Sequence, residues 1–491
     1  MQFFCLGSFF ILRGLLRSSN THPQSGDFRR ELLILAAPAI LGQAIDPLAQ
    51  LMETAYIGRL GPVELASAGV SVSIFNIISK LFNVPLLSIT TSFVAEDISK
   101  SSDRKLVPVN GASKELSNVI ADRERLPSVS SALVMAVGIG TVEALALFWA
   151  SGPFLSMMGI SPASSMRTPA QHFLRLRALG APANVVSLAI QGVFRGFKDT
   201  QTPLFCVGVG NISAAMLFPV LMYTLRLGVS GAALATVASQ YIATFLLVWR
   251  LSRRAVLLPP KILELDFRGY IKSGGLLLGR TLSVLFTMTL ATSMAARQGS
   301  MAMAAHQICL QVWLAVSLLS DALALSAQAL IASSFAKRDY ERVKGIANYV
   351  LKVGVLAGIA LAVILGASFG SMAKVFTTDI EVQRIVATGL LFVSASQPIN
   401  ALAFIFDGLH FGVSDFSYSA LSMMVIGAIS SLALLYAPSI FGLRGVWFGL
   451  TLFMSLRMTA GFLRLQWRTG PWSFLHHSGG SIPKVRASES F

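Results

Sequence analysis

Charged residues are scarce in this chain. Asp, Glu, Lys and Arg make up 13% of its 491 residues, about half of the ~25% that is typical of soluble domains. Apolar residues make up 54%, and the mean hydropathy is +0.68. So few charges leave too little polar surface to cover the exterior of a water-soluble protein of this length. The composition therefore excludes an array of soluble domains and indicates an integral membrane protein.

The features of several other functional classes are missing as well. The three cysteines, Cys5, Cys206 and Cys309, have neither a disulfide pattern nor the spacing of metal ligands. The sequence contains no nucleophile–base arrangement and no phosphate-binding loop, so we expect no enzyme activity, no cofactor and no metal. The formal charge is +16, but the basic residues lie in short loops and not on one face. Because the positive-inside rule explains such a surplus, we do not expect nucleic-acid binding.

Apolar blocks of about twenty residues, the length that crosses a ~30 Å hydrocarbon core, repeat along the chain. They predict an all-α polytopic membrane protein with twelve transmembrane helices. The predicted spans are 32–57, 66–94, 129–151, 171–194, 203–225, 229–250, 271–296, 302–332, 346–369, 386–409, 418–437 and 442–464. Lys and Arg gather in the N-terminal segment, in the loops after even-numbered spans and in the C-terminal tail. This distribution predicts that both termini lie on the cytosolic or stromal side.

The two halves of the chain are related by an internal repeat. Residues 61–95 match residues 299–333 without gaps. A second set of six residues recurs 216 positions later. It consists of Pro182, Asn184, Gln191, Gly192, Gly196 and Asp199, which correspond to Pro398, Asn400, Asp407, Gly408, Gly412 and Asp415. Five of the six positions are identical, and the sixth has Gln191 in the first half and Asp407 in the second. Six spans per half make the repeat parallel, with a cavity expected between the halves. We predict two six-helix lobes.

The predicted domain boundaries follow from these spans. The first lobe covers 31–250 and includes a polar, flexible loop at 96–128; the second covers 271–465. A linker at 251–270 joins the lobes, and 466–491 form a C-terminal tail.

Residues 1–30 are rich in Arg and Ser, and their first acidic residue is Asp27. Such a basic segment is typical of an organelle transit peptide, and equally of an ordinary cytosolic tail. Both interpretations stay open.

Charged side chains inside a span each cost about 2.5–3.5 kcal/mol or more, so each one needs a reason. The first span carries Asp46 and Glu53, which lie on one helical face because they are seven positions apart. Pro38 and Pro47 in the same span allow a bend. We predict that the two carboxylates couple transport to a cation. The alternatives are a buried structural hydrogen bond for Asp46 and an interfacial pair with Arg59 for Glu53.

The second lobe lacks both carboxylates, having Val284 and Ala291 at the matching positions, and carries Arg280 instead. We expect Arg280 to contact an anionic group; the alternative is an arginine that snorkels to the interface. The remaining candidates for a substrate cavity are polar residues within the spans: Asp321, Asp407, Gln191, Asn184 and Asn400.

Five segments resemble signatures of the multidrug and toxic compound extrusion (MATE) family, most closely the chloroplast-targeted members of its plant DETOX branch. They are 46–58 (DPLAQLMETAYIG), 61–66 (GPVELA), 191–203 (QGVFRGFKDTQTP), 305–308 (AHQI) and 398–408 (PINALAFIFDG). The resemblance implies a two-lobed antiporter that exports organic solutes or xenobiotics by alternating access, in exchange for protons or sodium.

The same resemblance bears on the site and the membrane. The family's first-helix carboxylate falls on Glu53, where many relatives have Asp. Acidic residues that some plant relatives place in helix seven are absent, and Arg280 lies there, so an organic anion is the expected solute. We expect a monomer in a chloroplast membrane, or alternatively in the plasma membrane. A lipid-carrier flippase of a related two-lobed fold is the alternative function.

Overall fold

The computed structural model describes residues 25–105, 126–158, 160–257, 267–376 and 380–476, and these are almost entirely helical. The first half contains α2 (Ser25–Gly58), α3 (Pro62–Lys105), α4 (Pro127–Trp149), α5 (Ser151–Met157), α6 (Arg167–Ala178), α7 (Ala181–Gly196), α8 (Gln201–Pro219), the π-helical turn η1 (Val220–Thr224) and α9 (Gly228–Ser252). The second half contains α10 (Phe267–Ala296), α11 (Ser300–Ala336), α12 (Tyr340–Phe376), α13 (Ile380–Ala395), α14 (Gln397–Gly412), α15 (Phe416–Phe441), α16 (Leu443–Gln466) and the 3-10 turn η3 (Ser473–His476).

The described residues contain ten helices that are long and apolar enough to cross a membrane, or twelve spans when two bent pairs each count as one. The bent pairs are α6–α7, with an angle of 46°, and α13–α14, with an angle of 48°. Pro182 and Pro398 lie in the first turn of α7 and of α14, where a proline is tolerated because the first helical N–H groups have no partner within the helix. The prediction of twelve spans is confirmed, and both breaks fall at the repeated prolines.

The repeat extends to the packing of the helices. A Cβ added to Gly140 in α4 would lie 2.6 Å from the Cα of Pro182. A Cβ added to Gly358 in α12 would lie 2.5 Å from the Cα of Pro398. The two halves therefore use the same glycine-to-proline contact to bring a neighbouring helix against the break.

The prediction of a flexible loop over 96–128 is wrong for its first part, because α3 continues as a helix to Lys105. Glu96 and Lys100 are 2.6 Å apart on successive turns, a pairing that stabilises an exposed helix. Residues 106–125 lie outside the described part of the chain.

The other predicted boundaries also shift. The last residues of the predicted leader, from Ser25 on, belong to α2, and residues 1–24 are not described. Within the predicted linker, 258–266 lie outside the description. The predicted tail begins with ordered structure, since Trp472 is fully buried and donates a hydrogen bond from Nε1 to Nδ1 of His410 at 3.1 Å.

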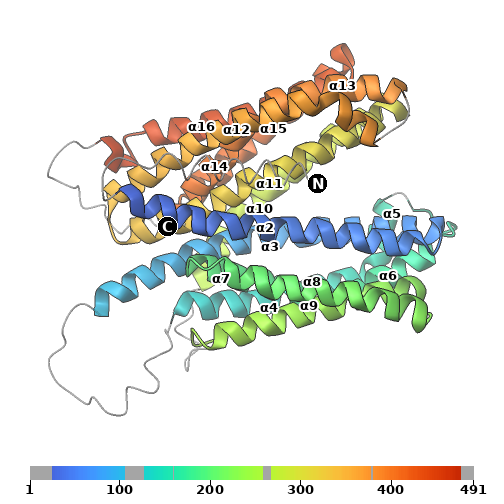
Figure 1. The fold of residues 1–491 in the computed structure, drawn as a ribbon, viewed down its shortest axis with the longest axis horizontal. Helices are drawn as coiled ribbons and strands as arrows, with labels where there is room; N and C mark the ends of the chain where they lie inside the picture. Colours follow the sequence, from blue (N-terminus) through green and yellow to red (C-terminus); the bar gives the residue numbers. More distant parts are fainter. Residues whose placement is uncertain (1–24, 106–125, 159, 258–266, 377–379, 477–491) are drawn as a thin grey trace.

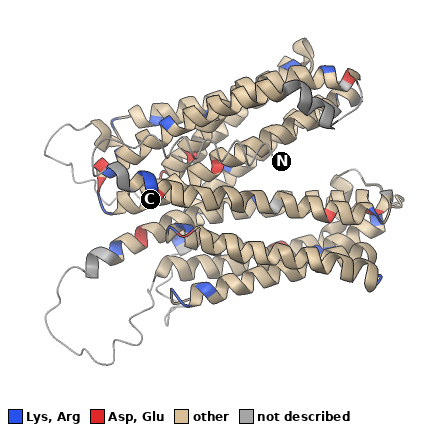
Figure 2. Ribbon diagram, viewed as in Figure 1, with Lys and Arg blue, Asp and Glu red and all other residues tan. Residues whose placement is uncertain are grey.

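Two groups of helices, α2–α9 and α10–α16, form the two lobes in Figure 1, where they converge at the left and diverge toward the right. We call the left side the terminal face; α2 begins there, and α3, α14 and α16 end there. The right side is the opposite face. Charged residues lie mostly toward the two ends of the bundle, with a few in its middle (Figure 2). The sorting of basic residues predicts that the terminal face is cytosolic or stromal.

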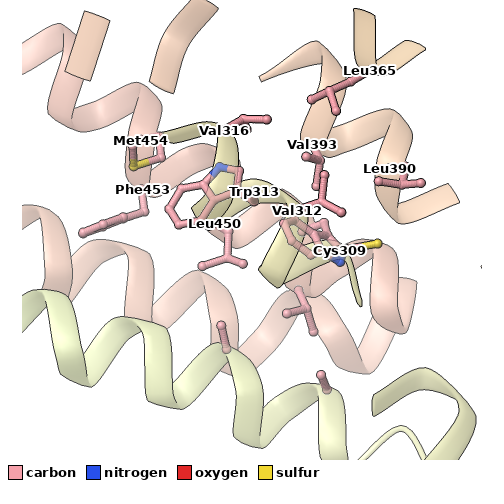
Figure 3. Close-up of a cluster of buried hydrophobic side chains, with 14 of the residues drawn as sticks. Cys309, Val312, Trp313, Val316, Leu365, Leu390, Val393, Leu450, Phe453 and Met454 are labelled. Carbon is pink, nitrogen blue, oxygen red and sulfur yellow. The ribbon is translucent and has the colours of Figure 1, made fainter. Parts of the chain in front are cut away.

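Each lobe has apolar packing of its own. In the first lobe, Ile57 at the end of α2 packs with Phe218 of α8. In the second lobe, Trp313 of α11 packs with Leu450 and Phe453 of α16 (Figure 3). The fully buried side chains of each of these two clusters come from one lobe only, although Ile40 of α2 packs against the second-lobe cluster.

Two further apolar clusters cross between the lobes, and both lie toward the terminal face. Leu32 and Leu35, at the start of α2, pack with Leu330 near the end of α11. Ile89 of α3 packs with Phe411 at the end of α14. Burial of apolar surface therefore joins the lobes at this face.

Hydrogen bonds reinforce the same junction. Gln328 of α11 donates to the backbone oxygen of Ser88 and to Oγ of Ser92 in α3, both at 2.8 Å. Ser92 in turn donates to the backbone oxygen of Phe411 at 2.7 Å. The bond between Gln43 of α2 and Asp321 of α11 lies nearest the middle of the bundle. Among the described residues, we find no hydrogen bond between the lobes closer to the opposite face.

Candidate transport site

A buried charge centre occupies the second lobe. Arg280 of α10 and Arg457 of α16 both donate from Nη2 to the same carboxylate oxygen, Oδ2 of Asp407 in α14. The distance from Arg457 is 2.5 Å. The side chains of Arg280, Asp407 and Arg457 are 9%, 18% and 6% exposed. Arg280 therefore does not snorkel to the interface; it contacts an anionic group, here a carboxylate of the protein itself.

Aromatic rings surround both guanidinium groups. Arg280 lies over the ring of Phe411 at 5.1 Å, and Arg457 lies over the rings of Phe404 and Phe453 at 5.2 and 5.5 Å. Cation–π attraction offsets part of the cost of removing these cations from water. The rings also limit the directions from which another group can approach the arginines.

Asp321 joins this centre to the lobe interface. Its Oδ2 accepts a hydrogen bond from Nε2 of Gln43 at 2.7 Å, and its charged neighbours are Arg195, Arg280 and Asp407. We refer to Arg195, Arg280, Asp321, Asp407 and Arg457 as the central charge cluster. It holds three guanidinium groups and two carboxylates, so it has one positive charge in excess when all five are ionised.

A narrow crevice without room for a water molecule lies beside Arg195, between the lobes. It is lined by Arg195 of α7, by Leu35 and Ala39 of α2, and by Ser326 of α11, among others. Arg195 is thus the member of the cluster that lines this crevice.

The first lobe contains a different centre around Glu53, which is buried in α2. Its Oε1 lies 3.4 Å from Nη1 of Arg177 in α6 and accepts a hydrogen bond from Thr236 of α9 at 3.1 Å. The alternative pairing with Arg59 is wrong, because the Arg59 guanidinium lies over the ring of Tyr56 at 6.0 Å. One carboxylate and one guanidinium balance each other here.

Asp46 lies in α2, but its side chain is outside the described part of the chain. Its role in coupling therefore stays a prediction. The helix α2 is continuous through Pro38 and Pro47, and a kink at these prolines likewise stays a prediction.

The paired asparagines of the repeat have unequal surroundings. Asn184 donates to Oγ of Ser79 at 3.0 Å, whereas Asn400 is buried and neither its Oδ1 nor its Nδ2 has a hydrogen-bond partner among the described residues. Within the described part of the chain, Nε2 of Gln191 donates to Oγ of Ser187 at 3.4 Å. Of the predicted cavity residues, the structure brings Arg280, Asp321 and Asp407 together and leaves the amides apart from them.

Five contributors were not singled out from the sequence: Gln43, Arg177, Arg195, Thr236 and Arg457. Arg195 lies one residue beyond the fourth predicted span. Arg177 and Arg457 lie within predicted spans, so the cost of a charge in the membrane could have identified both. No sequence signal marks Gln43 or Thr236, since neutral polar residues are common in such helices.

Three comparisons with known proteins bear on this arrangement. The family model MatE matches residues 126–221 and 277–437, more than half of the chain. "Protein DETOXIFICATION 45, chloroplastic" from Arabidopsis thaliana is 64% identical over 452 residues, which cover 92% of this chain and 81% of that protein. "Protein DETOXIFICATION 44, chloroplastic" from the same plant is 50% identical over 453 residues, covering 92% and 85%. The chain belongs to the MATE family.

Solved structures agree on the fold. A crystal structure of the Vibrio cholerae MATE transporter VcmN in the bent form has a TM-score of 0.77 at 17% identity and covers 91% of this chain and 98% of its own. A MOP superfamily transporter from Pyrococcus furiosus, described as having a binding pocket of reverse polarity, has a TM-score of 0.77 at 18% identity, covering 91% and 96%. This MATE protein is therefore a multi-span membrane transporter and not an enzyme, and its resemblance to the plant DETOX branch is confirmed.

Proposed function

We propose that this MATE protein is an antiporter that exports an organic anion in exchange for protons or sodium. The observation that carries the proposal is the central charge cluster, in which guanidinium groups outnumber carboxylates. Arginine presents a planar fork of N–H donors that matches a carboxylate or phosphate. A solute with such a group would balance the excess positive charge.

The internal carboxylate of Asp407 is the group that an incoming anion must displace. It occupies both Arg280 and Arg457, so two buried cations are not left unpaired between transport cycles. An incoming anion competes with Asp407 for the N–H donors of these arginines. Because the site is shielded from water, this competition is stronger than it would be at a surface.

Alternating access supplies the route. The lobes are joined by apolar packing and hydrogen bonds at the terminal face, while the buried core of each cluster toward the opposite face comes from one lobe. Rocking the lobes about the central charge cluster would break the junction at the terminal face and form another at the opposite face.

Coupling is assigned to the α2 carboxylates. Glu53 is buried beside a single arginine, and Asp46 lies two turns earlier in the same helix. Protonation or sodium binding would neutralise these groups and change the pairing of Glu53 with Arg177. The two DETOXIFICATION relatives are named chloroplastic, so we place this activity in a chloroplast membrane.

The test is uptake by proteoliposomes of labelled citrate and of a cationic dye, each with and without a pH or sodium gradient. We expect gradient-dependent movement of citrate and little movement of the dye. Transport of the dye alone would contradict the anion proposal, and citrate uptake indifferent to both gradients would contradict coupling. Asp46→Asn and Glu53→Gln, made separately, test the coupling residues; coupled transport retained in both would remove α2 from the coupling step.

A further inference from the structure

Glu143 is an acid that neither the fold nor the central charge cluster uses. It lies six residues before the end of α4, its exposed fraction is 1%, and both carboxylate oxygens are buried without a hydrogen-bond partner among the described residues. An ionised carboxylate in such a place would cost several kcal/mol. Nothing in these described surroundings stabilises the ionised form of Glu143.

No cation offsets this cost by direct contact, because neither carboxylate oxygen of Glu143 has a hydrogen-bond partner among the described residues. The charged groups on the helices packed against α4 have other partners or lie elsewhere. On α6, Arg175 bonds Ser151 and Arg177 bonds Glu53. Also on α6, Arg167 bonds Ser156, Gly152 and Ile160, and His172 contacts Ser230. The charged groups on the other helices packed against α4 are Glu64, Lys80, Glu96, Asp97 and Lys100 of α3, Arg195 of α7, and Arg268, Lys272 and Arg280 of α10.

The internal repeat shows that packing does not require an acid here. Gly140 and Gly358 make the same close contact with a proline at the α6–α7 and α13–α14 breaks. Three residues beyond each glycine lie Glu143 in the first lobe and Leu361 in the second, and both are buried. A leucine fills the equivalent position, so the carboxyl group of Glu143 has a purpose other than filling space.

The surroundings of Glu143 also contain a point at which the protein can move. Gly140 lies one turn before Glu143 and rests on Pro182, directly after the 46° break between α6 and α7. A change in this angle would shift the backbone against which that face of α4 packs. Water would then reach Glu143 from one side, and the proton could leave.

From these contacts we infer that Glu143 is a proton-binding site whose proton is exchanged in each transport cycle. The Glu143 carboxylate takes a proton from water in one conformation of the protein and returns it to water in another. Only the charge of Glu143 itself changes in this exchange. The site is additional to Asp46 and Glu53. The inference rests on the proposed proton coupling, so its test needs one measurement that is independent of transport.

That measurement is infrared spectroscopy of the purified full-length protein in lipid. Wild type should show the carbonyl band of a protonated carboxyl group, and Glu143→Gln should lack that component. The band should shrink when pH is raised under conditions that let the lobes move. Glu381→Gln is the matched control, because Glu381 is 61% exposed and its loss should leave the band unchanged. A difference spectrum without the band, or a band of equal size at acid and alkaline pH, overturns the inference.

The second measurement is the steady-state accumulation of solute driven by a pH gradient. Loss of one coupled proton lowers this accumulation about tenfold for each pH unit of gradient. Glu143→Gln mimics the protonated acid, and Glu143→Leu copies the second lobe, so both should retain solute binding and lose this factor. Unchanged accumulation in both variants overturns the inference. If wild type itself ignores the gradient, proton coupling fails, and the infrared band still decides whether Glu143 holds an exchangeable proton.

Discussion

The two lobes share their backbone plan and differ in their buried charges. In the first lobe, Glu53 faces Arg177 at 3.4 Å, and the charges balance. In the second, Asp407 receives hydrogen bonds from both Arg280 and Arg457. The same helical frame therefore supports a neutral pair on one side and a cationic centre on the other.

This difference assigns separate tasks to the lobes. A balanced pair can be altered by a single small cation, because binding a proton or sodium to Glu53 releases Arg177. A centre with surplus arginines attracts an anion instead. Two sites with opposite preferences on opposite lobes fit an exchanger, since each ligand can stabilise a different arrangement of the lobes.

The largest effect is expected from Asp407→Asn. This change leaves two buried guanidinium groups without their carboxylate, and breaking such a buried pair costs about 3–5 kcal/mol. The expected result is a large fall in the thermal unfolding temperature of the purified protein. Glu53→Gln is the matched variant in the first lobe, and its cost should be smaller because only one arginine is left. Equal losses for the two variants would show that the lobes do not differ in this way.

Arg457→Met makes the second lobe resemble the first, with one carboxylate facing one arginine. Hydrogen bonds to charged groups contribute about 1.5–3 kcal/mol each, so uptake of an organic anion should fall about tenfold or more. Initial rates in proteoliposomes measure this. Arg457→Lys keeps the charge and should retain more activity than Arg457→Met. If the methionine variant transported the anion at the wild-type rate, the excess charge would not be the basis of anion selectivity.

Much of the fold could be predicted from the sequence. Apolar block length predicted the twelve spans, and the repeated Pro182 and Pro398 mark both breaks. The helical extension of α3 to Lys105 was missed, because charged residues were taken to mean a loop. Polarity alone does not distinguish a solvated helix from a flexible connector.

The site was predicted only in part. The cost of burying a charge singled out Arg280, Asp321 and Asp407, which the structure brings together, but not which of them pair. Their role in a substrate cavity stays a prediction. The pairing of Asp407 with Arg457, from a helix 50 positions later, depends on how α14 and α16 cross. Likewise, Glu53 contacts Arg177 and not Arg59, which is nearer in sequence. The reason is that the fold places Arg177 of α6 beside Glu53, near the end of α2. Sequence separation carries no information about such contacts.

A symmetric change should test the shared part of the comparison. Gly140→Ala and Gly358→Ala each place a Cβ within 2.6 Å of a proline Cα, and overpacking of this kind costs about 1–3 kcal/mol. Because the two contacts are equivalent, both variants should lower the unfolding temperature by similar amounts. Gly138→Ala is the control on α4, since nothing lies within 4 Å of the added Cβ. Strongly unequal losses for the two substitutions would mean that the breaks in the two lobes differ mechanically.

The smallest effect is expected at the junction between the lobes. Glu31 of α2 bonds Lys198 of the first lobe at 2.7 Å and Arg342 of the second at 2.6 Å. All three side chains are about one third exposed, so each pair contributes only about 0.2–1 kcal/mol. Glu31→Gln should therefore leave the fold intact and change the balance between conformations a few-fold, in favour of those open at the terminal face.

Spin-label distances between the lobes at that face would measure the shift. Glu96→Gln removes an exposed pair that lies within α3 alone, and it should not alter the distance distribution. If the two variants gave the same distribution, Glu31 would be a surface charge without influence on the lobes. The junction would then depend on its apolar contacts and on the buried hydrogen bonds of Gln328, which are less accessible to water and cost more to break.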